Sequence, residues 1–197
     1  MGMLIDEVPT SVLIDGVSYA INWDFRYSVM FETLMLDTSI SDEDKLIKAL
    51  NLYYPVIPDN IDEAVDKLLW FYQRGHVDTS GKSKGKGGRG KRVYDYAHDD
   101  AYIYSAFREQ YGVDLQDDKI HWWKFKAMFQ ALSNETEFVK IMGYRGIKIT
   151  SSMTKSQREF YTEMKRIHAL PQPKNEVEKT KAIEEALLNG GDLSAFK

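Results

Sequence analysis

Short apolar runs separated by turn residues open the chain. Residues 11–21 hold two β-branched runs on either side of Asp15 and Gly16. A type I′ turn needs positive φ at both central positions, and an Asp-Gly pair accepts that geometry. We therefore predict a β-hairpin. An isolated hairpin is marginal in water, so it must pack on helices of its own chain, which we favour, or pair with a neighbouring subunit.

Helical spacing of apolar residues follows the hairpin. It predicts a helix over residues 22–36, a second that starts after Ser41 and closes before Pro55, and a third over residues 61–73. Ser41 precedes three acidic residues, which is the composition of a capped helix N-terminus. Asn60, three residues before a glutamate, predicts a variant of the capping box.

An aromatic-rich stretch over residues 94–144 is the centre of the pattern. Its first helical run begins at Tyr94 and ends at Gly112, where a C-cap glycine is expected. Its second covers residues 122–132 with spacing i, i+3, i+7, i+10. Each large aromatic removes ~150–250 Å² from water, so we expect most of these rings in the core and the surplus on a partner. The candidate partner-binding residues are Trp122, Trp123, Phe125, Phe129, Phe107 and Tyr104.

Three shorter patterns complete the chain. A helix is expected to end at Tyr144, followed by an extended segment or loop. Thr154 and Gln157 predict a capping box for a helix over residues 155–169. A last helix over residues 175–189 has only a thin apolar stripe. The apolar face of the helix over residues 155–169 is Phe160, Met164 and Ile167.

These elements predict a mainly α fold, in which a short N-terminal β-hairpin precedes a bundle of six or seven helices. We expect a hairpin-and-helix part over residues 1–78, a Gly/Lys/Arg-rich linker over 79–93, an aromatic-rich helical core over 94–170 and a C-terminal helix over 171–197. Together they fit one compact domain of 197 residues.

Composition narrows the class of protein. The chain is 43% hydrophobic and 28% charged, an ordinary globular balance, and it has no cysteine. Disulfides, thiolate metal sites and thiol nucleophiles are thereby excluded. No apolar run approaches the ~20 residues of a membrane span, and the N-terminus lacks a signal-peptide pattern. We expect a soluble, cytoplasmic protein with no membrane partner.

Charge is unevenly distributed along the chain. The net charge is −4, yet residues 79–92 hold six basic and no acidic side chains, which leaves 20 basic against 30 acidic residues elsewhere. We favour a solvated linker, with contact to an acidic protein surface next. Nucleic-acid binding through phosphates, with Tyr94 and Tyr96 stacking on bases, is the least favoured reading. The basic residues are Lys82, Lys84, Lys86, Arg89, Lys91 and Arg92.

No constellation of residues indicates catalysis. Asp95, His98, Asp99 and Asp100 resemble a metal cluster, but no second histidine follows at ligand spacing, so we predict a solvated acidic face. His121 precedes a helix and is expected to cap it or lie on the surface. Phosphate-loop and nucleophile-elbow contexts are missing. We predict no catalytic, cofactor-binding or metal-binding residues, and no enzyme.

The amino-acid sequence of the central stretch resembles that of a known protein family. YDYAHDDAYIYSAFREQYGVDL followed by IHWWKFKAMFQAL is similar to the gene product fifteen family of siphophages that infect Gram-positive bacteria, a family grouped with the tail assembly chaperones. The resemblance is most specific over residues 94–132. It implies a non-enzymatic protein of the host cytoplasm that binds and solubilises the tape measure protein, self-associates along it and is absent from the mature virion. The tail tube protein is a further implied partner.

The resemblance suggests that an apolar groove grips amphipathic helices of the tape measure protein. Two alternatives stay open. One is a nucleic-acid-binding phage protein that uses the basic residues 79–92. The other is a structural component of the virion tail.

Overall fold

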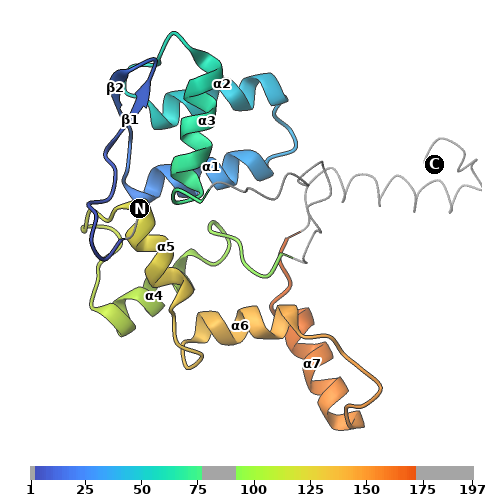
Figure 1. Ribbon diagram of the computed structural model, residues 1–197. Coiled ribbons are helices and arrows are strands. Elements are labelled where there is room, and N and C mark those ends of the chain that lie inside the picture. Colours follow the sequence, from blue (N-terminus) through green and yellow to red (C-terminus); the bar gives the residue numbers. More distant parts are fainter. Residues whose placement is uncertain (1–2, 77–91, 172–197) are drawn as a thin grey trace, which may run out of the picture.

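A hairpin and seven helices make up the part of the chain that the computed structural model describes, residues 3–76 and 92–171 (Figure 1). The mainly α prediction with an N-terminal hairpin is confirmed. Buried side chains from Val12 to Phe138 form one continuous core cluster. The elements are β1 (Ser11–Ile14), β2 (Val17–Ala20), α1 (Phe25–Leu36), α2 (Asp42–Tyr53), α3 (Ile61–Tyr72), α4 (Asp100–Tyr111), α5 (Trp122–Gln130), α6 (Glu137–Gly146) and α7 (Lys155–Ile167).

The hairpin has the predicted turn. Asp15 and Gly16 have φ values of 48° and 75° and join two antiparallel strands. The strands pack within the chain, because β1 lies on α3 and buries Val12. Only half of the predicted capping box forms at α3. The Asn60 side chain accepts the backbone N–H of Glu63, but the Glu63 carboxylate accepts the N–H of Asp15 at 2.9 Å and ties the turn to the helix.

Helix α1 starts later than predicted, and a tertiary contact explains why. Its Asp24 cap lies opposite His121, the cap of α5, in a short antiparallel bridge. The N–H of Phe25 donates to Ile120 O at 2.9 Å, and the N–H of Trp122 donates to the carbonyl of residue 23 at 2.8 Å. The extended backbone at residues 22–24 therefore joins the N-termini of two helices, and it is not available for a helical turn.

The segment before α4 is also non-helical, so the prediction of a helix from Tyr94 is wrong. Asp95 accepts the N–H groups of residues 97 and 98, while its own N–H donates to Asp99. These bonds build a tight turn. Helix α4 begins at Asp100 and ends, as predicted, at Gly112 with φ 68°. Arg92, which forms an ion pair with Asp95 at 3.0 Å, is the one basic-tract residue inside the described ranges.

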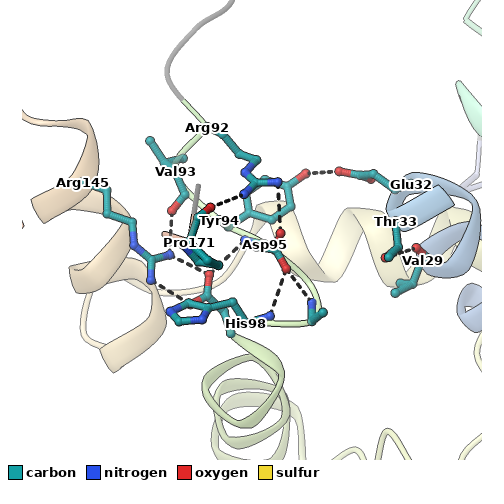
Figure 2. Close-up of polar contacts among 12 residues, drawn as sticks. Val29, Glu32, Thr33, Arg92, Val93, Tyr94, Asp95, His98, Arg145 and Pro171 are labelled. Carbon is teal, nitrogen blue, oxygen red and sulfur yellow. Dashed lines mark hydrogen bonds and ion pairs between the residues drawn. The ribbon is translucent and has the colours of Figure 1, made fainter. Parts of the chain in front are cut away.

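The predicted solvated acidic face is wrong at Asp99. This side chain is completely buried, and its two oxygens accept from Arg145 at 2.6 and 2.8 Å. Figure 2 shows Arg145 reaching the backbone of Val93, and a further nitrogen donates to the carbonyl of His168. Arg145 thus joins α4, α6, the residues after α7 and the segment that enters α4. Helix α6 runs through this arginine to residue 146, two residues beyond its predicted end.

One carboxylate holds the two chain segments that flank residues 77–91. The Tyr72 hydroxyl donates to Glu32 at 2.9 Å and the Tyr94 hydroxyl at 3.0 Å (Figure 2 shows the second bond). Lys126 lies beside them, with its Nζ 3.4 Å from the hydroxyls of Tyr94 and Tyr96. Burial lowers the pKa of Lys126, and the nearby Glu32 opposes that effect.

Helix α7 has the capping box that Thr154 and Gln157 predicted, and it stops at Ile167 instead of Ala169. None of its residues is buried, so its predicted apolar face does not enter the core. The predicted last helix over residues 175–189 lies outside the described residues.

Candidate functional site: a groove between α1, α4 and α5

A groove of about 500 Å³ lies where α1, α4, α5 and the loop after α4 meet. Its apolar residues come from all four segments, and polar side chains lie among them. A volume of ~300–1,000 Å³ with a mostly apolar lining is typical of protein sites that take a ligand or a few side chains. The lining residues are Phe25, Arg26, Val29, Tyr96, Asp100, Ala101, Ile103, Tyr104, Ser105, Leu115, Gln116 and Phe125.

The floor of the groove is rigid because it is part of the core. Phe25 and Phe125 stack with their ring centroids 4.4 Å apart, and Phe107 stacks on the other side of Phe125 at 4.9 Å. Ile103 and Leu115 complete this floor and are also buried. An occupant of the groove therefore meets a preformed apolar surface, which lowers the conformational cost of binding.

A guanidinium held by several hydrogen bonds is part of the groove lining. Arg26 forms an ion pair with Asp24 at 2.9 Å and donates to the carbonyls of Leu115 and Gln116 at 2.7 and 2.8 Å. It also lies over the Phe25 ring, 4.9 Å from its centroid. These bonds hold the loop after α4 against α1, so Arg26 shapes the groove and has little freedom to reach a ligand.

Tyr104 forms a partly exposed wall. Its hydroxyl donates to Asp114 at 3.0 Å, and this hydrogen bond raises the pKa of Tyr104. Backbone N–H donation from Gln116, with the Tyr104 bond second, lowers the pKa of Asp114. At neutral pH the wall therefore presents a neutral phenol edge beside an ionised carboxylate.

The structure brings two of the six predicted partner-binding residues to the groove, Tyr104 and Phe125. Phe107 and Phe129 lie in the core below it. Direct contact between these rings and a partner stays a prediction, and in this conformation only Tyr104 has substantial exposed surface.

Trp122 and Trp123 lie in the core and face α3. Their indole N–H groups donate to the carbonyls of Tyr72 and Phe71, each at 2.8 Å. Such bonds satisfy the one polar atom of a buried indole. Both tryptophans therefore fix α5 to α3 and lie away from the groove lining.

Sequence reasoning missed the α1 side of the groove. Phe25 and Val29 belong to the apolar pattern that predicts this helix, and their spacing of i, i+4 places them on one side of it. The signal that could have found them is the width of the apolar surface around α1. Phe31 is buried on another side of this helix, against Tyr53 and Tyr72. A helix with apolar residues around much of its circumference contacts more than one neighbour.

His121 has the predicted capping role and is buried, so it is not a surface residue. Its Nδ1 accepts the Trp123 N–H at 3.0 Å, and Nε2 lies 2.9 Å from the carbonyl of Pro9. Burial lowers the pKa of His121, which the Pro9 carbonyl opposes and Lys124 reinforces. A neutral ring that donates from Nε2 satisfies both contacts.

Residues 3–76 and 92–171 hold neither a candidate metal site nor a candidate membrane span. No group of three or more His, Cys, Asp or Glu side chains in these residues is placed to hold a metal ion. None of the helices there is both long and apolar enough to cross a membrane.

Comparison with known proteins identifies the family. Neither curated proteins nor solved structures gave a significant match. The sequence model of the family described as "Bacteriophage Gp15 protein" matches residues 4–170, which include the hairpin, all seven described helices and the groove. The chain therefore belongs to the bacteriophage Gp15 protein family.

Proposed function

We propose that this protein is a non-enzymatic phage tail assembly chaperone that binds and solubilises the tape measure protein in the host cytoplasm. In this role it self-associates along the bound partner, meets the tail tube protein during assembly and is absent from the mature virion. The observation that carries the proposal is the apolar groove between α1, α4 and α5. Family membership supports a phage function, and the resemblance of residues 94–132 to tail assembly chaperones supports this one.

The groove suits an amphipathic helix. Such a helix places apolar side chains at i, i+3 or i+4, and i+7 into a hydrophobic cleft. The buried floor of Phe25, Ile103 and Phe125 would receive those side chains. Asp100, at the groove lining, would face a polar flank of the bound helix. No covalent step is needed, and binding draws on apolar area removed from water.

Co-expression with the tape measure protein tests the proposal, followed by affinity capture and size-exclusion chromatography. Two matched variants on exposed positions of α4 show whether the groove is used. Ser105 lines the groove and Glu109, about one turn along, does not. We expect Ser105→Trp to fill the groove and weaken capture about tenfold or more, a loss of ~1.4 kcal/mol. Glu109→Trp should capture the partner as the wild type does.

Other outcomes would overturn parts of the proposal. A tape measure protein that stays insoluble beside a protein eluting alone contradicts the chaperone function. Capture of the partner that Ser105→Trp leaves unchanged, with circular dichroism showing a folded variant, contradicts the groove.

The two alternative functions have their own signs. Nucleic-acid binding would weaken steeply with salt and disappear when residues 79–92 are replaced by Gly and Ser. A structural virion component would be found in purified particles.

A further inference from the structure

Helix α7 carries an apolar stripe that the other described elements cover only in part. Phe160 and Ile167 are 49% and 53% exposed, and Met164 between them is half-buried. The helix is held on one side only, by the stacking of Tyr144 of α6 on His168 and by an edge contact between Tyr144 and Phe160. Figure 1 shows α7 projecting from the lower right of the molecule. Within the described residues, about half of the Phe160 and Ile167 surface therefore stays uncovered on a projecting helix.

A second apolar face lies where α1 ends and α2 begins. The core-facing stripe of each helix continues here beyond the core: Met35 is one turn after the buried Phe31, and Leu46 is one turn before the buried Leu50. The Lys45 ammonium donates to Met35 O and ties the two helix ends together. The large exposed apolar side chains are Met35 at 39%, Leu36 at 46%, Leu46 at 42% and Ile47 at 57%.

The two chain segments that carry these faces have opposite net charge. Residues 35–48 contain four acidic and two basic side chains, a net charge of −2, with three of the acids in the first turn of α2. Residues 147–169 contain five basic and two acidic side chains, a net charge of +3. Opposite potentials around apolar centres favour mutual docking and fix its orientation.

The two faces cannot meet within one molecule, because α2 lies above α1 in Figure 1 and α7 lies below, with α5 and α6 between them. A contact between them must join two copies. Because the two surfaces differ, such a contact is head-to-tail, and the resulting dimer keeps one free face at each end. A head-to-tail contact that does not close into a ring produces a chain of copies.

We propose that the apolar stripe of α7 in one copy docks on the α1–α2 face of a second copy, so that the protein assembles head-to-tail. This contact would provide the self-association that the proposed function includes, so its biological role rests on that proposal. The experiment that tests the contact does not depend on it. The purified chain alone suffices, so failure of self-association is distinguishable from failure to bind the tape measure protein.

Sedimentation velocity on the purified full-length protein over a range of concentrations tests the contact. We expect the wild type to form dimers and longer species as concentration rises, and to lose them as salt screens the charges. Ile47→Gln on the α1–α2 face and Phe160→Gln on α7 should each weaken association more than tenfold. Val56→Gln, at a 71% exposed position outside both faces, is the control and should assemble as the wild type does.

Mixing the two variants gives the decisive result. Each keeps one intact face, so an equimolar mixture should form a 1:1 dimer and nothing longer. Variants that stay monomeric when mixed would overturn the head-to-tail contact, as would a wild type that stays monomeric at every concentration or assembly that both variants leave intact. Unchanged circular dichroism and melting temperature establish that each variant is folded.

Discussion

At the scale of the residue, the least expected feature is a buried ion pair. The side chains of Asp99 and Arg145 are 0% and 5% exposed. Burial raises the pKa of Asp99, but hydrogen bonds from Arg145 and from the Asp95 N–H outweigh it, so the pKa lies below its usual value. The guanidinium also donates to the carbonyls of Val93 and His168, so it joins α6 to two further chain segments. A buried charge network of this kind costs most when one member is removed.

We predict that Arg145→Met lowers the free energy of unfolding by about 3–5 kcal/mol, because Asp99 is left buried without its partner. Urea denaturation followed by circular dichroism measures the change. Arg166→Met is the matched control, since Arg166 pairs with Glu163 at 2.7 Å but both side chains are exposed. It should leave the free energy of unfolding almost unchanged, because exposed ion pairs contribute little. Equal effects of the two substitutions would mean that the buried pair contributes no more than a surface one.

At the scale of the element, two glycines separate backbone geometry from packing. Gly16 in the hairpin turn has φ 75°, whereas Gly143 lies within α6. A Cβ atom added at either position meets nothing within 4 Å. Any difference between alanine substitutions at these two sites therefore comes from backbone conformation alone.

We predict that Gly16→Ala destabilises the protein by about 1–2 kcal/mol, because an L side chain is strained at positive φ. Gly143→Ala should stabilise it by about 0.5–1 kcal/mol, because alanine loses less backbone entropy in a helix. Thermal or urea unfolding of both variants gives the two signs. A Gly16→Ala variant as stable as the wild type would contradict the type I′ geometry of the turn.

Elements were predictable from sequence where their signal is local. The Asp15-Gly16 turn, the caps Ser41 and Thr154 and the C-cap Gly112 act on neighbours within a few residues, and each formed as predicted.

The errors lie where distant residues decide. Helix α1 starts late because Asp24 faces the α5 cap. The segment at Tyr94 is not helical because its hydroxyl donates to Glu32 and because Asp99 turns inward to Arg145. Helical spacing at Tyr94 contains no information on either partner.

The candidate site divides in the same way. Sequence reasoning named Tyr104 and Phe125 because aromatic spacing marks them, and both line the groove. It could not distinguish these groove residues from Trp122, a core residue whose indole N–H donates to the carbonyl of Tyr72. Nor could it find Leu115, a groove-lining loop residue whose carbonyl accepts a hydrogen bond from the distant Arg26. Which apolar residue is floor, wall or core depends on tertiary contacts.

At the scale of the whole molecule, buried phenols make stability depend on alkaline pH. Burial is the largest cause that raises the pKa of all five residues Tyr53, Tyr54, Tyr72, Tyr94 and Tyr96, and the Glu32 carboxylate adds to the effect at four of them. The fold therefore favours the neutral phenol. Its contribution is complete below the unfolded pKa of ~10 and is lost as pH rises above it. Lys126 acts in the opposite sense, but it is one group against five.

We predict that the free energy of unfolding falls between pH 10 and pH 11, by up to about 1.4 kcal/mol per pH unit for each phenol that is neutral in the fold and ionised when unfolded. Urea denaturation at pH 8, 9, 10 and 11 gives the profile. In Tyr72→Phe the free energy of unfolding should fall less steeply with pH. Each variant is compared with its own value at pH 8. A profile that is flat to pH 11 would mean that these hydroxyls ionise without loss of structure.

The Glu32 carboxylate has a practical consequence for engineering. Because the Tyr72 and Tyr94 hydroxyls end on the same carboxylate, the chain returns, after residues 77–91, to the place that it left. The closure entropy of such an excursion grows by only ~0.6 kcal/mol for each doubling of its length. This position is therefore suited as an insertion site, where an epitope or a small fluorescent domain can replace the native segment. The two positions at which a reporter would be joined, residues 76 and 92, are not part of the groove lining.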